Sequence, residues 1–270
     1  MKKLILNTSL TLLANSMLGL GSNFTSFENE YNLGYQFTQM TLINGAQNTV
    51  KFHPNSLNME IEHLFDANIW LDANLNMVVS YDQPYLGSAF NGADTTTHQA
   101  AALGQDPFMY SITMRGGYSF LPFNGNMQII PYAMFGRNAN WSASTAVANN
   151  YQSLASIDYF LTGGFGLRLG YKLLDNMLIY TDGLYSYNWD QSGAIKSIQT
   201  QNPPVGYGKS YAATNYQFTT TIGARYQITK DVELGVSGFW NNYQHQSNIA
   251  GVVYIPQNTF GEMISLGMTY

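Results

Sequence analysis

The final twelve residues, 259–270, read Thr-Phe-Gly-Glu-Met-Ile-Ser-Leu-Gly-Met-Thr-Tyr. Counting back from Tyr270, every second residue as far as Ile264 is large and apolar, and the residues between them are small or polar. This period-two alternation predicts a β-strand with one apolar and one polar face. Because chain ends fray unless a sheet holds them, we expect this strand to pair with another. In a closed barrel, which has no free edges, its partner is the first strand.

The same alternation recurs in longer segments of the chain. In residues 69–81 the odd positions are apolar or aromatic, whereas the even positions include Asp72. The pattern is repeated in residues 109–120, 159–173 and 216–228. These segments exceed the ~5–6 residues typical of strands in soluble proteins. About 11 residues at ~3.3 Å each, tilted by ~40°, rise ~28 Å, which matches the ~25 Å apolar band of transmembrane barrels.

The composition agrees with a membrane-spanning barrel. Charged residues make up 10% of the 270-residue chain, compared with roughly a quarter in ordinary soluble domains. After residue 22, no apolar run approaches the ~20 residues that a membrane-spanning helix requires. A β-barrel needs no such run, because alternate residues face lipid and lumen. The composition therefore predicts an all-β fold, an antiparallel transmembrane β-barrel.

Several classes of function are excluded by the same counts. A net charge of -5 without a basic patch excludes binding to nucleic acid. The chain has no cysteine, so neither disulfides nor a lipid-anchored cysteine are expected. Its four histidines are scattered without the spacing of zinc ligands. We therefore expect no metal and no cofactor.

The amino terminus predicts export. Lys2 and Lys3 precede an apolar stretch from Leu4 to Ala14, and small residues follow it. This order is typical of a signal peptide. We expect cleavage after about residue 16 or 22, so that residues 1–22 are the signal peptide and residues 23–270 form the barrel.

The clear and the weaker alternating segments together predict about ten strands, with eight or twelve as alternatives. They are residues 32–42, 57–65, 69–81, 109–120, 127–138, 157–173, 177–189, 214–228, 232–243 and 259–270. Short connectors alternate with long ones at residues 43–56, 82–108, 139–156, 190–213 and 244–258. Outer-membrane barrels have short periplasmic turns and long external loops. An even strand count also places both termini on the periplasmic side.

The signal sequence, the alternating strands and the terminal aromatic Tyr270 resemble the small outer-membrane β-barrel proteins of Gram-negative bacteria, the porin-like and opacity-like superfamily. The resemblance implies a place in the cell outer membrane and contact with its lipid and lipopolysaccharide. It also implies that the outer-membrane assembly machinery recognises the carboxy-terminal strand ending at Tyr270. Glu262 departs from the pattern, because it occupies an outward position of this strand where the family usually has an apolar residue.

If the apolar faces contact lipid, nine charged side chains point into the lumen. They are Glu60, Glu62, Asp72, Arg115, Arg168, Lys172, Asp182, Arg225 and Glu233. Folding the hairpins about their turns sets Arg168 opposite Asp182, Arg225 opposite Glu233, and Glu62 opposite Asp72. The last is a like-charge pair, which needs a nearby cation such as Arg115. We therefore expect an ion-pair network in the periplasmic half of the lumen.

The strand count limits what the lumen conducts. The interior of an eight-strand barrel is filled by its own side chains, whereas a sixteen-strand barrel leaves a channel. A barrel of about ten strands therefore leaves at most a narrow path. The sequence therefore predicts a structural or narrow-pore, porin-like role. An alternative is a surface protein that contacts an extracellular ligand through the loops 82–108 and 190–213.

A second alternative is enzymatic. The run His245-Gln246-Ser247-Asn248, followed by Glu262, contains a base, a hydroxyl and a carboxylate, as an activated nucleophile requires. It resembles the lipid A 3-O-deacylase family of outer-membrane barrels. That resemblance implies His245 as base, Ser247 as nucleophile and Glu262 as orienting acid, although this chain is longer and its spacing to the acid is larger. A polar loop between the last two strands explains the same residues without catalysis.

Overall fold

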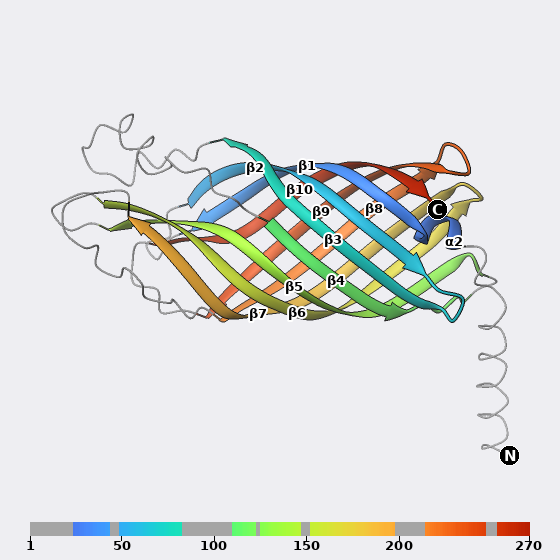
Figure 1. Ribbon diagram of the computed structural model, residues 1–270, viewed down its shortest axis with the longest axis horizontal. Helices are drawn as coiled ribbons and strands as arrows, with labels where there is room; N and C mark the ends of the chain where they lie inside the picture. Colours follow the sequence, from blue (N-terminus) through green and yellow to red (C-terminus); the bar gives the residue numbers. More distant parts are fainter. Residues whose placement is uncertain are drawn as a thin grey trace, which may run out of the picture.

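The computed structural model describes residues 24–43, 49–82, 110–122, 125–146, 152–197, 214–246 and 253–270. Within these residues, ten antiparallel strands close into one barrel, in the order β1-β10-β9-β8-β7-β6-β5-β4-β3-β2 (Figure 1). The strands are β1 (Glu30–Ile43), β2 (Thr49–Leu64), β3 (Ile69–Asp82), β4 (Tyr110–Tyr118), β5 (Met127–Ala146), β6 (Gln152–Leu174), β7 (Met177–Ser197), β8 (Thr214–Gln227), β9 (Val232–Gln246) and β10 (Val253–Thr269). The predicted fold class and the predicted count of ten strands are confirmed.

Several strands extend further than the sequence pattern predicts, four of them by six or more residues at one end. β2 begins at Thr49 rather than at residue 57, and β5 reaches Ala146 rather than residue 138. β7 continues to Ser197 rather than ending at residue 189, and β10 begins at Val253 rather than at residue 259. The predicted long loops are therefore shorter, and residues 190–197 of the predicted loop 190–213 belong to a strand. Residues 83–109 and 198–213, like the predicted signal peptide 1–22, lie outside the described residues.

The reason for the longer strands is visible in the β5–β6 hairpin. Its pairing runs without a break from Met127 opposite Tyr171 to Ala146 opposite Gln152. Apolar alternation reports contact with lipid, whereas backbone hydrogen bonds continue wherever two strands stay paired. Strand ends made of small and polar residues are therefore invisible to the alternation, although they are part of the sheet.

β1 and β10 close the barrel, as the sequence predicts for the last strand. Their pairing runs from Glu30 opposite Thr269 to Ile43 opposite Ile255. Tyr270 adds to this seam, because its backbone N–H donates to the carbonyl of Asn29 (3.1 Å) and its hydroxyl donates to the carbonyl of Glu62 (3.2 Å). The final aromatic residue thus joins both sides of the closure.

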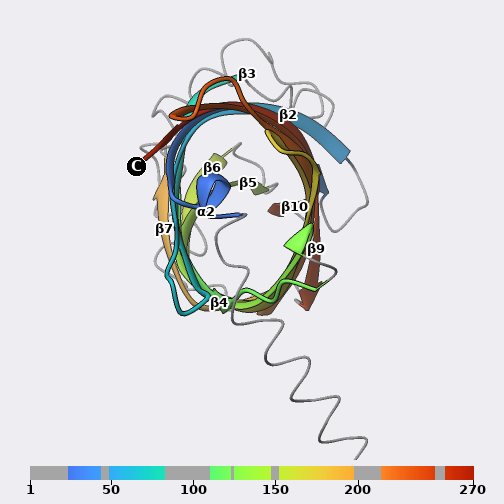
Figure 2. The same ribbon diagram turned by 90° about the vertical axis from the view of Figure 1, so that its right-hand side faces the viewer.

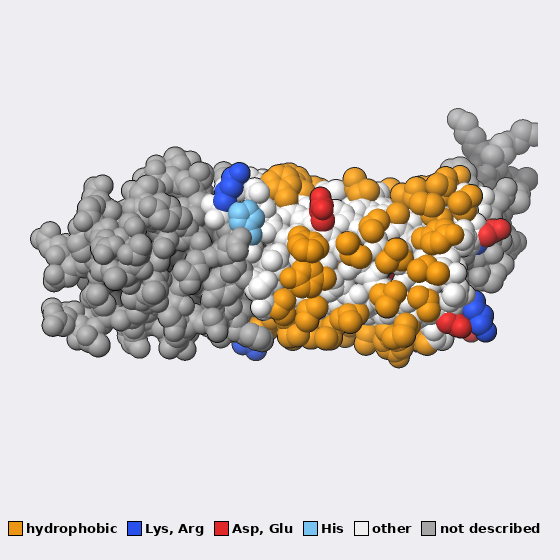
Figure 3. Space-filling view, turned by 90° about the horizontal axis from the view of Figure 1, so that it is seen from above, with side chains coloured by type: hydrophobic (Ala, Val, Ile, Leu, Met, Phe, Trp, Pro, Cys, Tyr) orange, Lys and Arg blue, Asp and Glu red, His pale blue; other side chains and the backbone are white. Residues whose placement is uncertain are grey.

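The outer wall carries an apolar band, which Figure 3 shows between the two ends of the barrel. Phe165 is 77% exposed, Met114 64% and Ile222 62%. Large side chains exposed to this extent over a whole belt are unfavourable in water and favourable in lipid. The outer wall is therefore the lipid-facing surface that the alternation predicts.

Glu262 interrupts this band. The β9–β10 register is unbroken from Asn258 to Met268, so no bulge turns Glu262 away from its outward position, and its side chain is exposed. It lines a groove of about 1000 Å³ on the outer wall, together with Phe37, Trp240 and Phe260. Glu262 therefore faces outward, as its position in the alternating pattern of the last strand predicts.

A short helix, α2 (Thr25–Glu28), precedes β1. Viewed end-on, it lies inside the ring of strands at the end of the barrel that carries the short turns (Figure 2). Phe24 and Phe27 are fully buried there against Leu121 and Leu178. The chain therefore enters the first strand from within the lumen.

No helix in the described part of the chain is long and apolar enough to cross a membrane.

Glycines let large aromatic side chains fit inside the barrel. Tyr132 on β5 points into the lumen, is 4% exposed and lies directly opposite Gly166 on β6. The end of its ring occupies the space that a Cβ at Gly166 would need. A larger residue at this position would therefore displace the ring from the lumen wall.

We predict that Gly166→Ala destabilises the barrel by about 1–3 kcal/mol, the usual effect of overpacking a filled interior. The measurement is urea unfolding of the refolded protein in lipid. Gly183→Ala is the matched control, because no atom lies within 4 Å of a Cβ added at Gly183. Equal destabilisation by the two variants would show that the fit of Tyr132 is not the cause.

Candidate functional site

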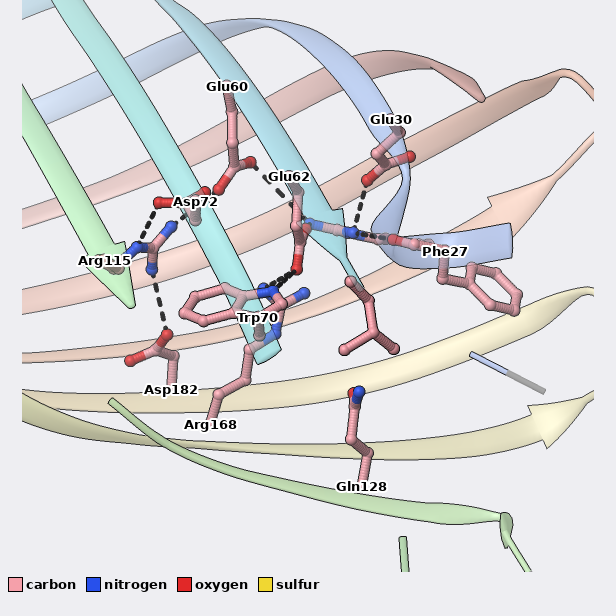
Figure 4. Close-up of polar contacts among 12 residues, drawn as sticks. Phe27, Glu30, Glu60, Glu62, Trp70, Asp72, Arg115, Gln128, Arg168 and Asp182 are labelled. Carbon is pink, nitrogen blue, oxygen red and sulfur yellow. Dashed lines mark hydrogen bonds and ion pairs between the residues drawn. The ribbon is translucent and has the colours of Figure 1, made fainter. Parts of the chain in front are cut away.

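Two clusters of ion pairs fill the lumen near the short-turn end (Figure 4). The first, here called the Glu62 cluster, is centred on a carboxylate of β2 that is fully buried. Glu62 Oε1 accepts hydrogen bonds from Trp70 Nε1 (2.6 Å) and Arg168 Nη1 (2.7 Å). Its Oε2 accepts one from Arg225 Nη2 (2.8 Å). One carboxylate therefore holds two arginines, from β6 and β8, that reach it from the opposite wall of the barrel.

The second group, the Arg115 cluster, has the opposite arrangement. The Arg115 guanidinium contacts Asp72 through Nε (2.6 Å), Glu60 through Nη2 (2.8 Å) and Asp182 through Nη1 (3.2 Å). The Tyr132 hydroxyl donates to the other oxygen of Asp182. All three nitrogens of the guanidinium are thus used, which is the geometry that makes arginine suitable for buried charge networks.

Two aromatic rings lie between the arginines, and one of them, Trp70, connects the two clusters. The Trp70 ring lies 5.5 Å from the Arg115 guanidinium and 5.6 Å from that of Arg168. The Tyr180 ring lies 4.9 Å from the Arg168 guanidinium and 5.4 Å from that of Arg225. These are cation–π distances. The rings separate the positive charges from one another and fill the space between them.

Arg225 also fixes the amino-terminal segment. Its Nη1 donates to the carbonyl of Phe27 (2.7 Å) and contacts Glu30 Oε1 (2.5 Å), while its Nε lies 3.6 Å from Glu233. The side chain of Arg225 is 6% exposed. The position of α2 in the lumen is therefore coupled to the Glu62 cluster.

Glu28, at the end of α2, is fully buried, and neither of its carboxyl oxygens has a hydrogen-bond partner of ordinary geometry among the described residues. Burial, together with the neighbouring Glu62, raises its pKa to about 8 against the opposing influence of Arg168, Gln128 and Arg225. Near neutral pH, Glu28 is therefore mostly a neutral acid beneath the Glu62 cluster.

Carboxyls outnumber guanidiniums in this part of the lumen, with seven against three. The acids are Glu28, Glu30, Glu60, Glu62, Asp72, Asp182 and Glu233, and the bases are Arg115, Arg168 and Arg225. With Glu28 neutral, the six other carboxyls still outnumber the three guanidiniums, which opposes the entry of an anion.

The structure places all eight main lumen residues predicted from the sequence in or beside these two clusters. Glu62 lies opposite Asp72, and Arg168 lies opposite Asp182, as hairpin folding predicts. The partners differ, however. Arg168 pairs with Glu62 across the lumen rather than with Asp182, which pairs with Arg115. Lys172 lies apart from the clusters, 3.8 Å from Asp175 in the turn.

The predicted register of Arg225 against Glu233 is wrong by two residues. Arg225 lies opposite Gly235, and Glu233 lies opposite Gln227. The hairpin is centred on residue 230 rather than 229, because Ile228 N–H bonds to the Val232 carbonyl across the turn. Glu233 nevertheless reaches Arg225 diagonally.

Sequence reasoning missed several residues of the site, including the aromatic side chains of Tyr132 and Tyr180. Glu30 lies two residues before Asn32, on the same inward face of β1, and accepts a hydrogen bond from it (2.6 Å). The predicted first strand began at residue 32, and a strand beginning two residues earlier would have included Glu30. Trp70 occupies an inward position of a predicted strand. Glu28 and Phe27 precede the first strand, where alternation carries no signal.

Above the clusters, toward the long-loop end, the lumen lining changes from charged to uncharged. A cavity of about 270 Å³ is lined mainly by amides and hydroxyls, with no charged side chain. Along its wall, Asn58 and Asn74 on neighbouring strands exchange hydrogen bonds (3.1 and 3.2 Å), and Ser111 donates to Asn138 (2.6 Å). A smaller cavity of about 180 Å³ lies below, bordered by Arg115, Arg168 and Arg225, and Phe239 borders both. We call the upper cavity the amide cavity.

The candidate catalytic residues do not meet in the described part of the chain. His245 lies near the end of β9, opposite Asn215, whereas Glu262 lies opposite Gly238. The seven residues between His245 and Gly238 correspond to about 23 Å along the strand. Ser247 lies outside the described residues. The residues that the structure describes also contain no group of three potential metal ligands.

Comparison with known proteins agrees with the fold. No protein-family model matches the sequence, and no curated protein matches it. The chain is similar to the β domain of the Bordetella autotransporter BrkA, with 11% identity and a TM-score of 0.50, over 90% of this chain and 100% of that one. It is also similar to the outer membrane protease OmpT from Escherichia coli, with 12% identity and a TM-score of 0.48, over 90% and 97% of the two chains. The translocator domain of the autotransporter NalP from Neisseria meningitidis gives 10% identity and a TM-score of 0.47, over 100% and 97%.

The likeness to the BrkA domain, at 11% identity, shows a shared barrel fold. Together with the apolar band on its outer wall, this fold makes the chain a transmembrane β-barrel.

We predict that Glu62→Leu destabilises the barrel by about 3–5 kcal/mol, because it leaves Arg168 and Arg225 buried without their carboxylate. Urea unfolding in lipid measures the effect. Asp66→Asn is the control, since Asp66 is an exposed acid in the β2–β3 turn. If both variants unfolded at the same urea concentration, Glu62 would not be the centre of the network.

We also predict a pH dependence from Glu28. Its pKa is raised from 4.5 to about 8, so the folded barrel keeps a proton that the unfolded chain loses. The resulting stabilisation is complete below pH 4.5 and is lost as the pH rises to about 8, by up to about 1.4 kcal/mol per pH unit.

Urea midpoints measured between about pH 5 and about pH 9 test this effect. Glu28→Gln, which stays neutral, should flatten the decline, whereas Asp175→Asn in the exposed β6–β7 turn should leave it unchanged. An unaltered decline in Glu28→Gln would assign the titration to another group.

Proposed function

We propose that this protein is a structural barrel of the outer membrane whose lumen is closed at the short-turn end, and not an open diffusion pore. The observation that supports closure is a layer of side chains with almost no exposure. Phe27, Glu62 and Trp70 are 0% exposed, and Gln128 and Leu178 are 1% exposed. They come from α2, β2, β3, β5 and β7, so the layer extends across the lumen rather than along one wall.

The energetics of the layer support the same proposal. A solute crossing it would have to separate Glu62 from Arg168 or Arg225, leaving a buried charge without its partner. It would also have to displace Phe27, which packs against Leu121 and Leu178. Both contacts oppose spontaneous opening.

A narrow pore is the second candidate. The lower cavity of about 180 Å³ already reaches Arg168 and Arg225. Departure of α2 would therefore remove much of what lies between this cavity and the short-turn end. The excess of acids in the clusters would make such a path favour cations over anions.

The proposed partners follow from the two outer features of the barrel. The apolar band supports contact with outer-membrane lipid and lipopolysaccharide. The seam contacts of Tyr270 support recognition of the completed last strand by the assembly machinery. A role in surface interaction would depend on residues 83–109 and 198–213, and a lipid A hydrolase would require Glu262 to act without direct contact to His245.

We predict that the refolded wild-type protein gives no conductance steps in planar lipid bilayers, because the buried layer closes the lumen. Trp70→Ala removes the largest side chain of that layer and should produce small, cation-selective steps. Trp240→Ala is the matched control, since Trp240 lies on the outer wall and is 36% exposed.

Regular steps from the wild-type protein would replace the structural role with the narrow-pore role. Steps of equal size from Trp240→Ala would show that they arise from a disturbed barrel rather than from an opened lumen.

A further inference from the structure

Two buried polar atoms face the amide cavity without a partner. Asn241 on β9 and Thr259 on β10 lie directly opposite one another and are 7% and 4% exposed. Both line the cavity, and Asn241 Oδ1 and Thr259 Oγ1 have no hydrogen-bond partner among the described residues. Buried polar atoms of native proteins are nearly always satisfied. Two adjacent exceptions at one cavity wall therefore point to a molecule that hydrogen-bonds to both.

An apolar surface lies next to this polar pair. Phe239 is two residues from Asn241 on the same inward face of β9 and lies opposite Gly261. Its ring occupies the space that a Cβ at Gly261 would need, so it lies over the backbone of β10. Phe239 thus presents carbon atoms to a cavity whose other walls are mostly amides and hydroxyls.

The remaining walls define the charge and size of the ligand. None of the residues that line the amide cavity is charged. The amides of Asn58, Asn74 and Asn76 offer both donors and acceptors, which hydroxyl groups can match at once. No guanidinium or ammonium group lines the cavity to pair with an anion. The volume of about 270 Å³ lies just below the ~300 Å³ at which small-molecule sites begin, which suits a single sugar ring.

We infer that the amide cavity is a binding site for a small uncharged polyhydroxylated molecule, of the size and chemistry of a monosaccharide. The hydroxyls of the ligand bond to Asn241 Oδ1 and Thr259 Oγ1, and its C–H face packs on Phe239. The site lies above the closed layer, so it needs no passage through the barrel and does not depend on the proposed structural role.

The test is ligand-observed saturation-transfer NMR on the full chain refolded in detergent micelles, with D-glucose as probe. D-glucuronate, which differs by a carboxylate, tests the selectivity against anions. Asn241→Leu and Thr259→Val each remove one orphan oxygen, and Phe239→Leu removes the ring. Asn242→Leu is the matched control, because Asn242 is the next residue on β9, faces the outer wall and bonds to Asn258. Heat-modifiable migration on gels verifies that each variant is folded.

We expect saturable glucose binding that is weakened about tenfold by each of the three inner variants, the usual effect of losing one good contact, and that is unchanged in Asn242→Leu. Glucuronate should bind more weakly than glucose. The absence of saturable binding would overturn the proposal and leave a cavity that holds only water. Glucose binding that survives all three inner variants would overturn the proposal and place the site in another part of the chain. Preference for glucuronate would also overturn it and would assign binding to the arginines below.

Discussion

The buried carboxylate of Glu62 is the contact on which the organisation of the lumen depends. A charge without solvent is tolerated only when it is paired and hydrogen-bonded, and Glu62 receives three donors. Without it, Arg168 and Arg225 would repel one another at close range. Arg225 also holds the carbonyl of Phe27, so the amino-terminal segment is positioned through Glu62. The backbone of the same residue accepts the Tyr270 hydroxyl, which links the network to the closing seam.

Period-two alternation was sufficient to predict the barrel, because lipid and lumen impose opposite chemistries on alternate residues. It also identified eight of the ten charged residues of the lumen clusters, but not Glu28 and Glu30. Partner choice was not predictable, since hairpin folding relates only neighbouring strands. Glu62 and Arg168 are 106 residues apart, on β2 and β6, and meet only because the sheet is closed. A spacing rule for neighbouring strands assigned Arg168 to Asp182 and could not consider a partner across the barrel.

The sequence did not predict the ends of the long strands or the segment before β1, for a different reason. Alternation reports contact with lipid, so it stops where β5 and β7 leave the apolar band, although their hydrogen bonds continue. The same limit hides the segment before β1. Glu30 shares its parity with the strand, but α2 carries neither alternation nor a helical period long enough to detect. Its position follows from tertiary contacts, namely the packing of Phe24 and Phe27 and the hydrogen bond from Arg225 to the Phe27 carbonyl.

The division of the lumen into a charged half and an uncharged half follows from water access. Ion pairs are strong only where water is excluded, and Phe27 and Trp70 exclude it at the short-turn end. The exclusion depends in turn on Arg225, which binds the segment that carries Phe27. The buried layer and the ion pairs therefore stabilise one another. Above this level, from Phe239 toward the long-loop end, amides and hydroxyls replace the charges. Neutral polar groups can hydrogen-bond to water or to one another, so they do not need an oppositely charged partner.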